Sequence, residues 1–127
     1  MNDLTHNETT TPTEQVADRP VVRPAVDVFE NQDEILLVAD LPGVTSESLS
    51  VDLEDDRLTI HGRRAKGPGD DARLLMGTDT AWDYRRAFTV PDAVDVEKIK
   101  ANLEDGVLTL HLPRHERTKP RRIHVKA

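Results

Sequence analysis

Hydrophobic and polar residues alternate along most of the segment from residue 25 to residue 113. An alternation with period two is typical of β-strands that bury one face. Turn-forming pairs such as Pro42-Gly43 and Asp105-Gly106 interrupt the alternation at short intervals. Short alternating strands between frequent turns predict an all-β fold, an antiparallel β-sandwich. The expected strands cover residues 35–41, 48–53, 57–61, 84–90, 98–104 and 108–112.

The first of these strands is hydrophobic on both sides. Its odd-numbered residues from Ile35 to Leu41 would lie on one face, and Leu36 and Val38 on the other. Strands with two apolar faces occur where both faces of a sheet are covered. We therefore expect this strand to be covered on both sides.

Two segments of this body resemble each other. Residues 53–61 read LEDDRLTIH, and residues 103–111 read LEDGVLTLH. Each segment predicts a strand, a tight turn and a second strand. The similarity fits either a relic of duplication or two hairpins of one sandwich that converged on the same pattern.

Residues 64–83 break the alternation. Gly67-Pro68-Gly69 makes this segment loop-like, and loops of such length inside a compact domain are often functional. Within it, Leu74, Leu75 and Met76 are apolar enough for a short strand that has no partner nearby in the sequence. We expect that strand to pair with a sheet elsewhere, with another subunit as one option.

The two ends of the chain differ from this body in composition. Residues 1–24 are polar, so we expect a disordered or extended arm. Residues 114–127 form a basic tail with a net charge of +5, whereas the rest of the chain carries −12. The length of 127 residues suits one domain. The sequence thus predicts a flexible N-terminal arm (1–24), a domain (25–113) and a C-terminal extension (114–127).

Composition excludes several classes of function. A formal net charge of −7 argues against a general nucleic-acid binder, which needs a basic face. The chain has no cysteine, which excludes disulfides, thiolate metal sites and thiol catalysis. It has no apolar run long enough to span a membrane, and residues 1–18 lack the apolar stretch of a secretory signal. We therefore expect a cytoplasmic protein.

No constellation of residues points to catalysis. The sequence contains neither a Gly-x-Ser-x-Gly elbow nor a Gly-rich phosphate loop. The acidic run from Asp52 to Asp56 lacks the ligand spacing of a calcium loop. His61 and His111 lie in the outward phase of their strands, so we expect solvent-exposed residues rather than metal ligands. The sequence therefore predicts no enzyme, no cofactor and no metal site.

Arg86 introduces a charge among apolar residues, because it shares the phase of Tyr84 and Phe88. An unpaired buried arginine would cost several kcal/mol. Either this part of the strand lies at a sheet edge, where Arg86 reaches water, or Arg86 forms an ion pair across a subunit interface. The alternation alone favours neither.

The basic tail carries an isolated apolar pair, Ile123 and Val125, which no neighbouring residue can bury. Residues 114–122 would span roughly 30 Å if extended, enough to reach another subunit. Burial in a groove would contribute roughly 1.5–3 kcal/mol per side chain, less the ordering costs. Two alternating strands are candidates for such a groove, through Leu49, Val51, Leu53, Ile99, Ala101 and Leu103.

Several motifs, in the expected order, resemble the small heat-shock protein, or α-crystallin, family of the bacterial type. Residues 101–108, with Ala101, Gly106, Val107 and Leu108, are similar to its A-x-x-x-n-G-v-L signature. The resemblance covers about residues 25–127. Further matching segments are residues 39–44 (ADLPGV), 58–62 (LTIHG), 84–91 (YRRAFTVP) and 123–125 (IHV).

This resemblance implies an immunoglobulin-like sandwich, the α-crystallin domain, that forms homodimers and larger homo-oligomers. It implies an ATP-independent chaperone, a holdase, that binds unfolding proteins under stress. Arg86 matches the family's interface arginine, and residues 72–77 match a strand exchanged with the dimer partner. Ile123 and Val125 match residues that dock between two strands of a neighbour, here about 48–54 and 98–104.

The sequence departs from the family at two places. Asp105 stands where the turn usually has Asn, which is a mild change because Asp also tolerates turn geometry. The arm of residues 1–24 has no aromatic residue and is shorter than is usual in the family, so we expect smaller or less stable oligomers, or client binding shifted to the sandwich grooves. The alternative function is a non-catalytic co-chaperone binding module of the CS-domain type, which a strictly monomeric protein would favour.

Overall fold

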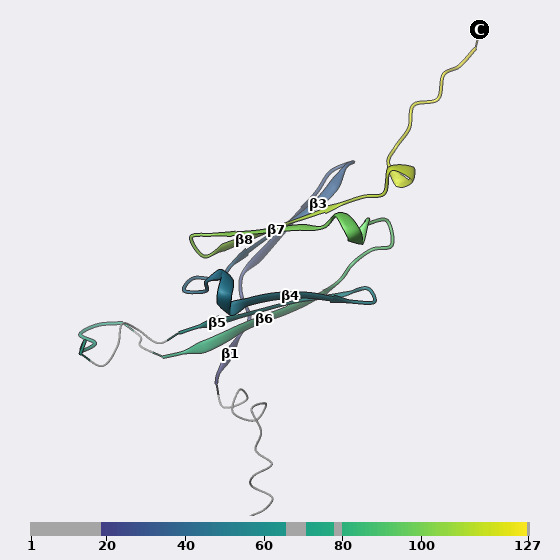
Figure 1. The fold of residues 1–127 in the computed structure, drawn as a ribbon. Helices are drawn as coiled ribbons and strands as arrows, with labels where there is room; N and C mark the ends of the chain where they lie inside the picture. The colour runs from purple at the N-terminus through teal and green to yellow at the C-terminus, as the bar shows by residue number, and fades with distance from the viewer. Residues whose placement is uncertain (1–18, 66–70, 78–79, 127) are drawn as a thin grey trace, which may run out of the picture.

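The chain folds into two four-stranded β-sheets that face each other (Figure 1). The computed structural model describes residues 19–65, 71–77 and 80–126, so residues 1–18 of the expected arm and Gly67-Pro68-Gly69 lie outside the described residues. The first sheet has the order β1-β6-β5-β4, and the second β2-β3-β8-β7. The predicted all-β sandwich is therefore confirmed.

The strands of the first sheet are β1 (Val21–Val22), β6 (Trp82–Thr89), β5 (Arg57–Arg64) and β4 (Leu49–Glu54). Those of the second are β2 (Val26–Glu30), β3 (Glu34–Asp40), β8 (Val107–Pro113) and β7 (Lys100–Glu104). All neighbouring strands are antiparallel except β1 and β6, which are parallel. Three single-turn 3₁₀ helices complete the described fold: η1 (Ser46–Ser48), η2 (Val96–Lys98) and η3 (Glu116–Thr118).

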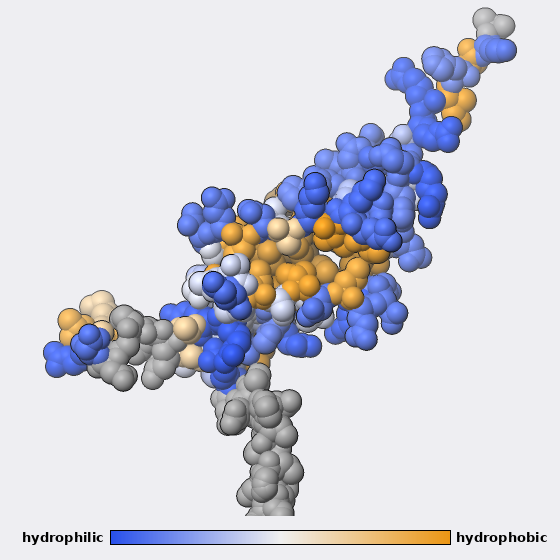
Figure 2. Space-filling view, viewed as in Figure 1, coloured by the Kyte–Doolittle hydropathy of each residue, from blue (hydrophilic) through white to orange (hydrophobic). Residues whose placement is uncertain are grey.

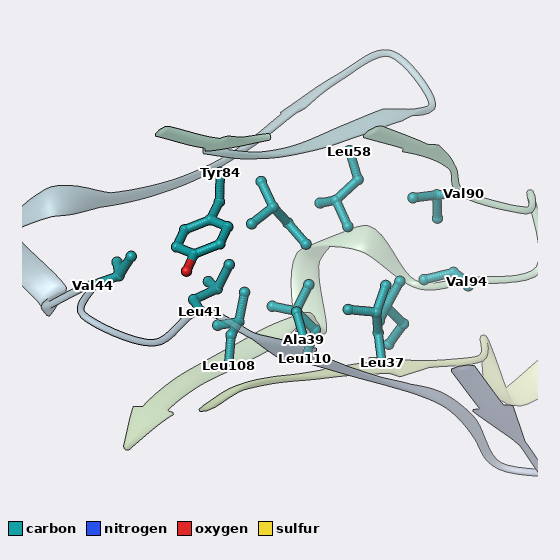
Figure 3. Packing of buried hydrophobic residues seen from close by; sticks show 12 residues of the cluster. Leu37, Ala39, Leu41, Val44, Leu58, Tyr84, Val90, Val94, Leu108 and Leu110 are labelled. Atoms are coloured by element: carbon teal, nitrogen blue, oxygen red, sulfur yellow. The ribbon is translucent and has the colours of Figure 1, made fainter. Parts of the chain in front are cut away.

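The core lies between the two sheets, where alternate residues of facing strands meet (Figure 3). Leu58 and Ile60 of β5 lie opposite Leu108 and Leu110 of β8, and all four are at most 2% exposed. Burial of such a side chain contributes about 1.5–3 kcal/mol. Tyr84 adds an anchor, because its hydroxyl donates a hydrogen bond to the carbonyl oxygen of Pro42 at 3.3 Å. The period-two pattern thus decides which residues form the core.

The outer face of β3 differs from the expectation. Leu36 and Val38 lie on that face and are half-buried, whereas Leu37 and Ala39 on the inner face are buried. Their cross-strand neighbours on β8 are His111 and Thr109, which shield them from the side. Complete covering of both faces of β3 was therefore a wrong expectation for the single chain.

Residues 19–24, expected in the arm, lie against the first sheet. Val21 and Val22 form β1 and pair with Asp83 and Tyr84 at the start of β6. Beyond Pro113 the tail passes through η3, and residues 121–126 are exposed and run outward from both sheets (Figure 1). Within the described ranges, no helix is long and apolar enough to cross a membrane.

Candidate assembly surfaces

The two strands of the predicted groove, β4 and β7, are edge strands of opposite sheets. Their register decides which side chains face inward. Leu49, Val51 and Leu53 pair with Gly62, Ile60 and Leu58 of β5, which are buried. On the other side, Ala101 and Leu103 pair with the buried Leu110 and Leu108 of β8.

These inward side chains are only partly covered, because nothing described flanks β4 or β7 on its outer edge. Leu49, Val51, Ile99 and Leu103 pack against the core and are half-buried. Ala101 and Leu53 are exposed. Figure 2 shows a band of hydrophobic residues between the two sheets on the face that has β4 and β7 in front. The predicted groove residues therefore lie on two edge strands, and most of them pack against the same core.

The apolar pair of the tail is exposed. Ile123 is 83% and Val125 is 89% exposed, and neither lies in a strand. At the base of the tail, Arg114 Nη2 lies 2.8 Å from a carboxylate oxygen of Glu30. Its own sandwich thus leaves the apolar pair free for a partner.

Arg86 faces inward near the edge of the first sheet and is half-buried. Its Nη1 atom donates a hydrogen bond to the carbonyl oxygen of Pro24 at 3.0 Å, and its guanidinium lies 5.3 Å from the centroid of the Phe88 ring. Its Nε atom is buried and has no hydrogen-bond partner within the part of the chain that the structure describes. A buried donor without an acceptor is costly, so this position is incompletely satisfied in a single chain.

The connection between β5 and β6, residues 65–81, carries three large apolar residues that are also exposed. Leu74, Leu75 and Met76 are 51%, 81% and 89% exposed. They form no strand in the single chain, and residues 71–77 lie beyond the ends of both sheets (Figure 1). The edge of β6 is also incompletely covered, because β1 pairs only with Asp83 and Tyr84. Residues 85–89 thus present an edge that β1 leaves open.

Asp83 is a functional candidate that the sequence analysis missed. It is 1% exposed, although it lies on β6 in the phase of solvent-facing residues. Its carboxylate oxygens lie 2.7 Å from Arg19 Nε and 3.0 Å from His61 Nε2, and Arg63 Nε lies 3.8 Å away. Nothing in the local pattern could reveal this cluster, because its members come from β6, β5 and the residues before β1.

The cluster has a defined electrostatic effect on Asp83. Burial by itself would raise the pKa of Asp83, but the hydrogen bonds and positive charges of Arg19 and His61 outweigh it. The pKa of Asp83 therefore lies below its usual value, and the carboxylate stays charged at neutral pH.

The two strand histidines differ from each other. His111 is exposed, as expected, and its Nδ1 atom lies 3.0 Å from a carboxylate oxygen of Glu34. His61 is half-buried against Asp83, so the expectation that it is solvent-exposed was wrong. The alternation along β5 correctly predicted that His61 points away from the core. It could not show that Asp83 lies beside His61 on that face.

The signature residues around the β7–β8 turn have structural roles. Gly106 has φ = +76°, and a Cβ atom there would lie 3.1 Å from Pro42 Cα. Leu41 N donates a hydrogen bond to the carbonyl oxygen of Gly106 at 2.6 Å. Leu108 is buried, while Ala101 and Val107 are exposed. The β7–β8 turn thus packs closely against the residues that follow β3, and this packing requires glycine at position 106.

Comparison with known proteins gives a consistent result. The family model described as "Hsp20/alpha crystallin family" matches residues 27–126. Spore protein SP21 of Stigmatella aurantiaca is 35% identical over 84% of this chain, which corresponds to 63% of that protein's length.

Two solved structures are similar in fold. Heat shock protein 16.0 from Schizosaccharomyces pombe aligns with a TM-score of 0.67 and 28% identity over 83% of this chain and 99% of that one. A small heat-shock protein from Xylella fastidiosa, whose structure is described as revealing a distinct high order structure, aligns with a TM-score of 0.59. It is 28% identical over 82% of this chain and 96% of that one.

Proposed function

Because the chain belongs to the Hsp20/alpha crystallin family, we propose that it is a stress-response chaperone that works without ATP. It would bind proteins as they unfold and limit their aggregation, with no catalytic step. The observation that carries this proposal is the hydrophobic band between β4 and β7, together with the exposed Ile123 and Val125. Apolar surface of this kind on a highly charged chain marks a site for other proteins.

The first assembly step in this proposal is a homodimer. The edge of β6 that β1 leaves open, residues 85–89, would accept residues 72–77 of a partner as an added strand. Leu74, Leu75 and Met76 would then be buried, and the partner would supply an acceptor for the buried Nε atom of Arg86. One contact would thus both cover the exposed apolar residues and pair the unpaired donor of Arg86.

The second step joins dimers through the tail. Ile123 and Val125 would dock into the β4–β7 groove of another copy, against side chains such as Val51 and Leu103. The gain of roughly 1.5–3 kcal/mol per side chain, less the ordering cost, gives a weak and exchangeable anchor. An anchor that exchanges leaves the groove intermittently free for client segments. The high order structure of the Xylella fastidiosa relative supports larger assemblies.

The test is suppression of heat-induced turbidity of a model client by the full chain without nucleotide, together with the solution mass. We expect suppression near equimolar ratios and a mass of at least a dimer. A strict monomer that fails at several-fold molar excess would point to the CS-domain type of binding module. The cytoplasmic location and the lack of nucleic-acid binding stay predictions.

A further inference from the structure

The base of the 65–81 segment is held by Arg19, which lies far from it in the sequence. Arg64 ends β5 and Trp82 begins β6, so their carbonyl groups flank the two ends of this segment. Arg19 Nη2 donates hydrogen bonds to both carbonyl oxygens, at 2.9 Å to Arg64 and 3.0 Å to Trp82. Its Nε atom donates to the Asp83 carboxylate at 2.7 Å. One guanidinium therefore joins both strands at the point where the segment leaves the sheet.

The same contacts attach the N-terminal residues to β6. Asp83 N donates a hydrogen bond to the carbonyl oxygen of Pro20 at 2.9 Å, and β1 follows directly. Because β1 has only two residues, its ladder alone is a weak attachment. Charge-assisted hydrogen bonds from a partly buried arginine to a buried carboxylate are stronger than neutral ones. The Arg19–Asp83 pair thus adds a strong attachment to the short ladder of β1.

A second set of contacts stiffens the base from within. The Arg64 guanidinium lies 4.1 Å from the centroid of the Trp82 ring, and Arg64 Nη1 donates a hydrogen bond to the carbonyl oxygen of Thr80 at 2.6 Å. The Trp82 ring also contacts the Tyr84 ring edge-on, at 6.0 Å between centroids. The direction in which the segment leaves the sheet is therefore set by Arg64, Trp82 and Arg19 together.

We propose that Arg19 is a positioning residue that couples the N-terminal arm to the dimer interface. By holding the carbonyl groups of Arg64 and Trp82, it fixes the direction in which residues 72–77 project toward a partner. Detachment of residues 19–22 from the edge of β6 then loosens the segment, and the dimer weakens. This coupling rests on the proposed exchange of residues 72–77.

The test compares Arg19→Ala with Arg63→Ala in the full chain. Arg63 also faces Asp83, but at 3.8 Å and 53% exposed, so it controls for the loss of a positive charge there. Trp82, the single tryptophan, reports on the base through acrylamide quenching of its fluorescence. The dimer dissociation constant is measured on the same samples by sedimentation. Quenching is recorded at concentrations where each variant is dimeric, so that dissociation does not cause the change.

We expect Arg19→Ala to make Trp82 more accessible and to weaken the dimer roughly tenfold, as the loss of a charge-assisted hydrogen bond implies. Arg63→Ala should change neither quantity. If Arg19→Ala unfolds, Arg19→Lys replaces it, because lysine keeps the charge beside Asp83 but lacks the planar fork that reaches two carbonyl groups and a carboxylate.

The two proposals fail in different ways. Unchanged quenching of Trp82 in the Arg19 variant would overturn the positioning role, whatever the dimer constant does. More accessible Trp82 with an unchanged dimer constant would overturn the coupling, because the interface would then not depend on how that segment is held. A parent protein that forms no dimer in sedimentation would overturn the proposed exchange of residues 72–77 instead.

Discussion

Arg86 donates a hydrogen bond from Nη1 to the carbonyl oxygen of Pro24 at 3.0 Å. Pro24 is buried and lies between β1 and β2, where the chain passes from one sheet to the other. Arg86 is therefore oriented by its own chain before any partner binds, while its Nε atom is left without an acceptor within the described ranges. In the proposed dimer, this oriented side chain would donate its remaining Nε–H group to the partner.

Replacing Arg86 with Ala or Gly should weaken the dimer, because the partner's acceptor would lose its charged donor. The expected cost is about 2–5 kcal/mol in dimer stability, measured by sedimentation over a dilution series. Arg85→Ala is the matched control, since Arg85 is exposed on the opposite face of β6. An unaltered dimer dissociation constant in the Arg86 variants would remove this residue from the interface.

Replacing both Ile123 and Val125 with Gly should leave dimers intact and reduce the larger species. The reason is the loss of roughly 1.5–3 kcal/mol of apolar burial per side chain. Native mass spectrometry gives the distribution of sizes directly. His124→Gly makes the same backbone change between the two positions and should preserve the distribution, so a similar loss in that control would point to tail flexibility instead.

Ala101→Arg should prevent docking by changing the groove instead of the tail. Ala101 is exposed on an edge strand, so a long side chain fits without unfolding the domain, but it would occupy the path of the docking tail. We expect Ala101→Arg to give the same size distribution as the Ile123/Val125 double variant. Combining Ala101→Arg with the two tail substitutions should cause no further change. Asn102→Arg, on the outer face of β7, should assemble normally. Full-sized assemblies of Ala101→Arg would exclude this groove as the docking site.

The stability of the domain should depend on the charge of Asp83. Since the pKa of Asp83 is lowered in the folded protein, its stabilising contribution is complete above the ordinary value of 3.8 and is lost as pH falls through the lower folded value. Asp83→Asn should therefore lower the melting temperature at neutral pH, and the difference from the parent protein should shrink in strong acid. A difference that stays constant over this pH range would mean that packing, not charge, explains the effect.

Gly106→Ala should destabilise the domain by roughly 1–3 kcal/mol, because the residue combines a positive φ with close packing against Pro42. Chemical denaturation measures the change. Gly77→Ala separates the two causes, since Gly77 also has a positive φ but a Cβ atom added there would meet no described atom within 4 Å. Equal costs at both glycines would show that backbone strain alone is responsible.

The strands were predictable from the sequence because burial imposes period two on each of them. Leu58 and Ile60, or Leu108 and Leu110, alternate with polar residues in a way that only a half-buried strand explains. The turns were predictable for a different reason. Asp105 and Gly106 have positive φ, which few residue types adopt readily.

The Asp83 cluster was not predictable, because its contacts join residues far apart in the chain and follow no period. Arg19 and Asp83 are separated by 64 positions, and each looks like an ordinary surface residue in its own segment. The strand expected within residues 72–77 is a different case. In the proposed dimer its formation depends on a second chain, whose contacts appear in neither the local pattern nor the single folded chain.

The outward course of the tail has a consequence for symmetry. A tail that docks into the groove of another copy makes a head-to-tail contact between two different surfaces, which does not close on itself as a two-fold contact does. Whether such contacts close into a shell or continue as a filament depends on the angle between donor and acceptor. Residues 114–120 would contribute to that angle, because Arg114 pairs with Glu30 and Lys119 lies 3.8 Å from a carboxylate oxygen of Asp33, both on the domain. A few surface charges at the base of the tail would then determine the geometry of the whole particle.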